Sequence, residues 1–123
     1  TAASLVSENK VLCHPASVDS IPTSANQEDH NSLGSIAARK CFEVLVNTEK
    51  ILAIEILCAA QGIDFLKPLK CGRGTDSAYR QLRKNVKHIE EDVVMSEQIQ
   101  SVCDVIFSDV YVENVEKSAG KLF

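Results

Sequence analysis

The chain contains no tryptophan and few other aromatic side chains, which together make up 5% of its 123 residues. Aliphatic side chains must therefore do most of the packing. Hydrophobic residues make up 45% of the chain, which is enough to form a core. At this length we expect one domain at most.

The chain also lacks an excess of positive charge. It carries 13 Lys and Arg against 17 Asp and Glu, for a net charge of −4. Nucleic-acid binding needs a basic face, so this balance argues against a nucleic-acid partner. The longest strongly apolar run, Ile51 to Ala60, is interrupted by Glu55 and is too short to cross a bilayer. No basic segment precedes an apolar one at the first residues, so we expect no signal peptide and no membrane partner.

Cysteine is present, but not in the spacing of a disulfide framework or a zinc site. There are five cysteines, and none forms a Cys-x-x-Cys pair. An odd, widely spaced set fits free thiols in a reducing cytosol. Cys13 and His14 are adjacent, which suits joint ligation of a metal poorly, so we expect no metal ligands.

One long helix is predicted from Asn31 to Gly62. Apolar residues recur three and four positions apart along it, which is the helical period. Asn31 or Ser32 can cap its start, and Gly62 is placed where a helix-ending glycine belongs. The half from Ile51 to Ala60 is apolar on nearly every side, as in a buried helix. Such a helix would be roughly 46 Å long, against a diameter near 35 Å for a compact domain of this size. We therefore expect other helices, from elsewhere in the polypeptide or from another subunit, to cover it.

Residues 63–123 predict a connecting segment followed by shorter helices. Gly72-Arg73-Gly74 lacks the further glycine or Gly-Lys-Ser/Thr of a phosphate loop, so a turn is expected. Thr75 and Ser96 are predicted to cap the next two helices. Their inward residues are expected to be Tyr79, Leu82, Val86 and Ile89, and then Ile99, Val102, Cys103, Ile106 and Phe107. A last short element is predicted from Asp109 to Ser118, so the whole pattern is all-α.

The segment from His14 to Gly34 is polar, has no helical or strand period, and is longer than most structureless loops. Its two prolines and many cap-type residues indicate a fixed loop. Asp19, Ser20, Thr23 and Ser24 are expected to fold it on itself. From the residues alone, Glu28 could contact a substrate or could be an ordinary acid near the positive end of a helix.

This segment resembles the region of aromatic amino acid lyases, and of the histidine ammonia-lyases among them, that carries an active-site glutamate. The similarity covers His14 to Gly34, continues into Ser35-Ile36-Ala37-Ala38-Arg39-Lys40 and returns at Leu52-Ala53-Ile54-Glu55. It is strong over about Leu5 to Phe65, moderate to Met95 and weak after that. The resemblance implies a C-terminal segment of a larger lyase, with residues 1–30 as a helix end and active-site loop, 31–62 as a long bundle helix, and 63–123 as a connecting segment and short helices. The implied fold is the all-α, fumarase-aspartase-like helix bundle.

The resemblance also implies a chemistry. Such lyases eliminate ammonia with a methylidene-imidazolone prosthetic group made from an internal Ala-Ser-Gly, and with L-histidine the product is urocanate. Glu28 falls where histidine lyases place an acid facing the substrate imidazole, so it is the expected catalytic and substrate-binding residue. Gln27 is an expected substrate-binding residue. His30 and Asn26 are candidates for a supporting position, although His30 could equally be a structural hydrogen-bonding residue. The family is a cytoplasmic homotetramer with active sites built from several subunits.

The chain departs from the family pattern at two points. It contains no Ala-Ser-Gly, and Ser118-Ala119-Gly120 has the wrong order in the wrong region, so the prosthetic group is not encoded here and we expect this chain alone to be inactive. Asn31-Ser32-Leu33-Gly34 is closer to phenylalanine and tyrosine lyases, which generally have Gln where Glu28 stands. Two alternatives therefore stay open. One is part of a phenylalanine or tyrosine ammonia-lyase or an aminomutase, and the other is a non-catalytic helical assembly module of the same fold.

Overall fold

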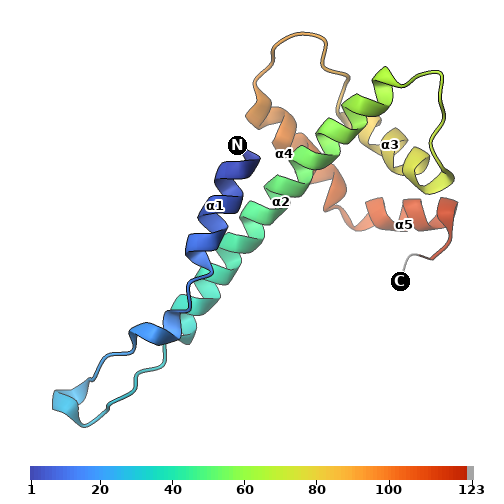
Figure 1. Ribbon diagram of the computed structural model, residues 1–123. Coiled ribbons are helices and arrows are strands. Elements are labelled where there is room, and N and C mark those ends of the chain that lie inside the picture. The colour runs from blue at the N-terminus through green and yellow to red at the C-terminus, as the bar shows by residue number, and fades with distance from the viewer. Residues whose placement is uncertain (122–123) are drawn as a thin grey trace. The chain divides into compact units, whose positions relative to one another are not determined.

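The computed structural model describes residues 1–121, in which the regular secondary structure is helical and loops connect the helices (Figure 1). One isolated β-bridge lies within a loop. The all-α prediction is confirmed. The α-helices are α1 (Ala2–Leu12), α2 (Gly34–Phe65), α3 (Arg73–Asn85), α4 (Met95–Ile106) and α5 (Asp109–Ala119). Two short 3₁₀ turns, η1 (Ala16–Asp19) and η2 (Ser24–Asn26), lie between α1 and α2.

The long helix exists, but both its first and its last residue lie three positions later in the sequence than expected. Gly62 lies inside α2, so its assignment as the helix-ending glycine is wrong. A glycine inside a helix costs only about 1 kcal/mol. Asp64, two residues further along, is held by Lys67 and Arg83, which favours continuing the helix. At the other end, Ser32 Oγ accepts the Gly34 amide at 3.4 Å, so Ser32 does help to start the helix.

The caps expected for the next two helices are also wrong. Thr75 lies inside α3, whose N-cap is Gly72, because the Asp76 amide already donates to the Gly72 carbonyl at 2.8 Å. Ser96 lies inside α4, whose N-cap is Val94. The last helix, α5, closely matches the predicted element and is followed by Gly120.

The contacts within the chain divide it into two compact units, residues 1–51 and residues 52 onward, with the boundary inside α2. In the first unit, α1 lies alongside the first part of α2 (Figure 1). Asn9 on α1 donates to the Val44 carbonyl at 3.5 Å and to Thr48 Oγ1 at 3.3 Å. Asn47 returns bonds to Glu8 and Asn9 at 3.1 Å each. Polar side chains therefore connect the two helices.

The second unit contains the main hydrophobic core. Its buried residues come from α2, from α3 and its C-cap, and from α4: Ala53, Leu57, Ala60, Leu82, Val86, Val102 and Ile106. Tyr79, Ile89, Ile99 and Cys103 pack against them, as the helical period predicted. Phe107 was expected to face inward, but its side chain is 47% exposed. It follows the last turn of α4 as the C-cap, where the backbone leaves the helical path.

Gly74 belongs to a helix contact. A β-carbon at this position would lie 3.1 Å from Ala119 Cβ and 3.9 Å from Val115 Cγ1, both on α5. Few real β-carbon contacts are that tight, so the missing side chain lets α3 and α5 approach closely. Gly72 caps α3, so the two glycines of Gly72-Arg73-Gly74 each have a structural role.

Large apolar side chains on α2 remain uncovered. Phe42 is 65% exposed, Leu45 54% and Leu52 41%. At 32 residues, α2 is about 48 Å long. These observations agree with the expectation that this chain does not cover its long helix by itself. Among the described residues, no helix meets the length and hydropathy needed to cross a membrane.

Candidate functional site

The loop between α1 and α2, residues 13–33, projects past the ends of both helices in the first unit (Figure 1). Its first residues are held against α2, because Lys40 Nζ donates to the His14 carbonyl. Ala16, in η1, is buried. The remainder of the loop is mostly exposed and is shaped by its own hydrogen bonds, as expected for a fixed polar loop.

Thr23 and Glu28 close the tip of the loop. Their backbones form an antiparallel bridge, in which the Thr23 amide donates to the Glu28 carbonyl at 2.8 Å and the Glu28 amide donates to the Thr23 carbonyl at 3.3 Å. Thr23 Oγ1 also donates to Glu28 Oε2 at 3.1 Å. Three bonds therefore fix both the backbone and the carboxylate of Glu28 relative to Thr23.

Between Thr23 and Glu28 the backbone turns through an unusual conformation. Ser24, Ala25 and Asn26 have φ angles of 52°, 54° and 68°, all in the left-handed region. An L-residue there costs roughly 1–2 kcal/mol. The Gln27 amide donates to the Ser24 carbonyl at 3.1 Å across this turn. The bonds that close the tip therefore hold a backbone that its residues disfavour on their own.

A second closure lies nearer to the helices. The Asn31 amide donates to Ser20 Oγ at 2.9 Å, and Ser20 Oγ lies 3.2 Å from the Asn31 carbonyl, to which it donates. Ser20 and Thr23 were both expected to fold the loop on itself, and both do so with their hydroxyl groups. The loop is thus closed at two levels.

The predicted site residues all lie on this loop and are exposed: Asn26, Gln27, Glu28 and His30. The structure brings Asn26, Gln27 and Glu28 together at the tip. His30 instead lines a cavity of about 370 Å³ at the start of α2, together with residues that include Asn31, Ser32 and Ala37. Within the part of the chain that the structure describes, Glu28 does not line that cavity. Glu28 Oε1 receives no hydrogen bond from the described residues, so one carboxylate oxygen is available to a ligand.

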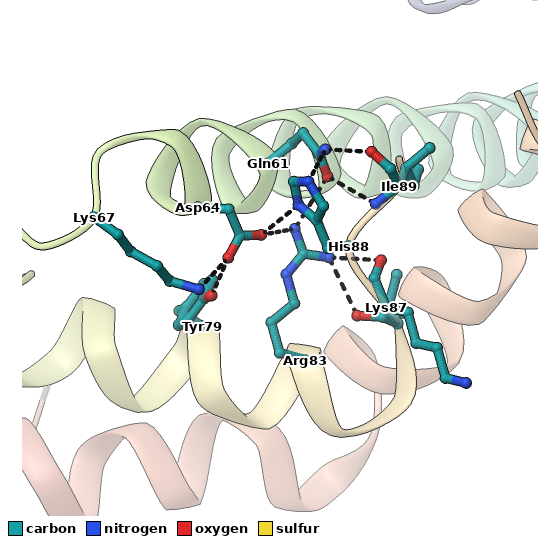
Figure 2. Close-up of polar contacts among 9 residues, drawn as sticks. Gln61, Asp64, Lys67, Tyr79, Arg83, Lys87, His88 and Ile89 are labelled. Carbon is teal, nitrogen blue, oxygen red and sulfur yellow. Dashed lines mark hydrogen bonds and ion pairs between the residues drawn. The ribbon is translucent and has the colours of Figure 1, made fainter. Parts of the chain in front are cut away.

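A cluster that we had not predicted lies in the second unit, around Asp64 in the last turns of α2 (Figure 2). Asp64 Oδ1 accepts from Lys67 Nζ at 2.7 Å and from the Tyr79 hydroxyl. Asp64 Oδ2 lies 2.8 Å from Arg83 Nη2 and 3.0 Å from His88 Nδ1. The Asp64 and Arg83 side chains are only 8% and 12% exposed.

These partners decide the charge of Asp64. Burial by itself would raise the pKa of this carboxyl group, but the hydrogen bonds from Lys67, Tyr79 and His88 and the charge of Arg83 outweigh it. The pKa of Asp64 is therefore held well below its usual range. The hydrogen bond between Lys67 and Asp64 also raises the pKa of Lys67. Asp64 is an ionised carboxylate under ordinary conditions.

Gln61 determines the tautomer of His88. Gln61 Nε2 lies 2.7 Å from the Ile89 carbonyl and 3.3 Å from His88 Nε2, while Gln61 Oε1 accepts from the Ile89 amide at 3.3 Å (Figure 2). An amide nitrogen only donates, so His88 Nε2 must be the acceptor. The proton of the neutral ring is then on Nδ1, where it is donated to Asp64 Oδ2.

The Asp64 cluster is suited to holding α2, α3 and the segment after α3 together. Four donors occupy the two carboxylate oxygens of Asp64. Arg83 Nη1 also donates to the Val86 and Lys87 carbonyls, at 3.2 and 3.0 Å. No oxygen of Asp64 is left for a substrate. An acid near the end of an apolar helix was the available signal, but its partners lie up to 24 residues away and no local pattern identifies them.

The described residues contain no group of three or more His, Cys, Asp or Glu side chains arranged to hold a metal ion, and no disulfide joins any of their five cysteines. The segment with the composition closest to Ala-Ser-Gly, Ser118-Ala119-Gly120, is at the end of α5. Ser118 Oγ lies 3.1 Å from Ser77 Oγ and 3.3 Å from the Asn114 carbonyl, within hydrogen-bonding distance of both. These residues are engaged in helix packing and do not fit the formation of a methylidene-imidazolone.

Comparison with known proteins gives consistent matches. The family model described as aromatic amino acid lyase matches residues 1–84. The chain is 54% identical over 122 residues to the histidine ammonia-lyase of Natranaerobius thermophilus, covering 99% of this chain and 24% of that protein. The chain thus spans about a quarter of the length of the curated relatives it matches.

Two solved structures share the fold. The histidine ammonia-lyase of Trypanosoma cruzi superposes with a TM-score of 0.87 and 46% identity, covering 94% of this chain and 23% of that one. The tyrosine aminomutase of Streptomyces globisporus superposes with a TM-score of 0.84 and 31% identity, covering 94% of this chain and 22% of that one. The loop and α2 are therefore placed in the context of much longer enzymes.

Proposed function

Because this chain belongs to the aromatic amino acid lyase family, we propose that it is the C-terminal part of a histidine ammonia-lyase, which eliminates ammonia from L-histidine to give urocanate. The observation that carries the proposal is the Glu28 carboxylate, which is exposed on a loop of fixed shape and has Oε1 unused. The 54% sequence identity of this chain to the histidine ammonia-lyase of Natranaerobius thermophilus supports histidine as the substrate.

Glu28 would bind the imidazole ring of the substrate. An ionised carboxylate accepts hydrogen bonds but cannot donate them, so it suits a ring N–H and favours a ring that carries positive charge. A phenyl ring offers no such donor. Gln27 lies beside Glu28 at the loop tip and is the second residue that we place at the substrate. Asn26 and His30 would support the loop from its turn and from the start of α2.

The prosthetic group, when present in the complete enzyme, supplies the electrophile that activates the amino group for departure. It would come from an Ala-Ser-Gly in the remaining three quarters of the protein. What this chain contributes is the binding and orientation of the ring, and part of the helix bundle that encloses the site.

Replacing Glu28 with Gln in the full-length enzyme tests the proposal. Loss of a charge-assisted bond of about 1.5–3 kcal/mol lowers kcat/KM for histidine by roughly 10- to 150-fold. If Glu28 also handles a proton, the loss should be about 10²- to 10⁴-fold. Unfolding should be unchanged, because Gln has nearly the same shape and the side chain is exposed. Urocanate formation followed by ultraviolet absorbance gives the rate, and an unchanged rate would remove Glu28 from the active site.

A second candidate is part of a tyrosine or phenylalanine lyase or an aminomutase. The similarity to the tyrosine aminomutase of Streptomyces globisporus favours it, as does the sequence Asn31-Ser32-Leu33-Gly34. Glu28 argues against it, because a carboxylate gains nothing from a phenyl ring. Assaying histidine, phenylalanine and tyrosine with the full-length protein separates the two. A non-catalytic assembly module would turn over none of them.

We also infer a cytoplasmic homotetramer in which other helices cover α2. The exposed Phe42, Leu45 and Leu52 side chains support an assembly of this kind.

A further inference from the structure

We propose that the Thr23 hydroxyl positions the Glu28 carboxylate for the substrate, a role that rests on the function proposed for Glu28. Thr23 is a positioning residue here, because it would act only through Glu28. The juxtaposition that carries the inference is the bond from Thr23 Oγ1 to Glu28 Oε2, at 3.1 Å, across a backbone bridge between the same two residues.

The backbone bridge fixes where the Glu28 side chain begins, but it does not fix where the carboxylate points. A glutamate side chain has three rotatable bonds and loses considerable freedom when it is held in one conformation. Glu28 is exposed, so no neighbouring core restrains it. The Thr23 hydroxyl supplies that restraint at Oε2 and leaves Oε1 for the ring N–H of the substrate. Positioning of this kind before binding lowers the cost of ordering the group in the complex.

Thr23 is also well suited to substitution, because its backbone is extended, with φ −128° and ψ 177°. Valine has the same branched shape and favours the same region. Both backbone bonds to Glu28 use main-chain atoms, which Thr23→Val retains. This substitution therefore removes the hydroxyl bond and keeps the bridge. Thr23→Ser keeps a hydroxyl on the same carbon and serves as the conservative variant.

The test uses the full-length enzyme and combines these variants with Glu28→Gln. Thr23→Val should lower kcat/KM for histidine by about 5- to 30-fold, while Thr23→Ser should stay within about threefold of the parent. In the Glu28→Gln background, Thr23→Val should have little further effect, because the carboxylate that it positions is already absent. Thr75→Val is the matched control, since Thr75 is exposed and its hydroxyl makes no hydrogen bond among the described residues. Thermal unfolding of each variant confirms that it is folded.

The outcomes separate the two proposals. A large loss in Glu28→Gln together with normal kinetics in Thr23→Val would overturn the positioning role and leave the function of Glu28 intact. Equal losses from Thr23→Val in both backgrounds would show that the hydroxyl acts through the loop as a whole, and that too would overturn the inference. Normal kinetics in Glu28→Gln would overturn the role of Glu28, and the role of Thr23 with it. Rescue by Thr23→Ser with a shared, non-additive loss supports the inference.

Discussion

Asp64 on α2 and Arg83 on α3 form a nearly buried ion pair, with 2.8 Å between Asp64 Oδ2 and Arg83 Nη2. Charges taken out of water are favourable only when their remaining hydrogen-bonding groups are satisfied. Asp64 meets that condition with four partners, while Arg83 Nε remains without one among the described residues. Removing the acid would leave Arg83 Nη2 and His88 Nδ1 without their carboxylate partner.

The first prediction is that Asp64→Ala destabilises the second unit by about 3–5 kcal/mol, as for other buried pairs that lose one member. Urea unfolding followed by circular dichroism measures the change. Glu113→Ala is the matched control, because its ion pair with Lys117 is long, at 3.9 Å, and both side chains are mostly exposed. That control should change stability by less than about 1 kcal/mol. Equal effects of the two substitutions would contradict the assigned importance of Asp64.

The second prediction concerns pH. The pKa of Asp64 is lower in the folded chain than its ordinary value of 3.8. The unfolded state therefore takes up this proton first, so the stabilisation is complete above that ordinary value and is lost as pH falls toward the folded pKa. Urea unfolding at pH values from about 6 down to about 2.5 should show wild type losing stability more steeply than Asp64→Asn. If the stability of wild type and of Asp64→Asn fell in parallel with pH, the cluster would not be lowering the pKa of Asp64.

The third prediction is that the chain alone associates or aggregates. Burying a large apolar side chain contributes about 1.5–3 kcal/mol, and several such side chains are exposed on α2. Light scattering over a range of concentrations measures the effect. Replacing Phe42 and Leu45 with Gln should reduce association, whereas Lys50→Gln, on the same helix, should not. A soluble monomer at high concentration would refute the prediction.

The fourth prediction is that the isolated chain forms no urocanate from L-histidine. It has no Ala-Ser-Gly from which to build the electrophile, and the similar Ser118-Ala119-Gly120 is engaged in helix packing. Ultraviolet absorbance at high protein concentration is a sensitive assay, and full-length enzyme provides the positive control. Turnover by the pure chain would require a different chemistry from the one proposed.

Local sequence patterns predicted the helices and the polar loop well. The period of apolar residues identified Leu82, Val86, Val102 and Ile106 as inward-facing, and the hydroxyl residues Ser20 and Thr23 do fold the loop. The predicted caps failed at Gly62, Thr75 and Ser96, because a cap motif is a weak local preference that neighbouring contacts override. Gly62 is tolerated inside α2 because the last turn of the helix is anchored through Asp64.

Local sequence patterns could not predict the geometry of the Asp64 cluster or of the loop tip. Asp64, Arg83 and His88 are brought together by tertiary packing, so no spacing in the sequence marks them as partners. At the loop tip, Ser24 and Ala25 carry no signal for a left-handed backbone, which is usually the place of glycine or asparagine. The roles of Glu28, Gln27, His30 and Asn26 remain predictions, since they depend on a substrate and on the rest of the enzyme.

The left-handed backbone at Ser24, Ala25 and Asn26 limits which sequences can replace this turn. Valine, isoleucine and threonine at these three positions would strain a backbone that already opposes L-residues. Glycine would fit the turn, but it would also give the unfolded chain more freedom. A short peptide copying residues 21–30 would lose the shape, because the Ser20–Asn31 closure and the flanking helices lie outside it. Grafting this loop into another protein would therefore require both closures and the two helix ends that carry them.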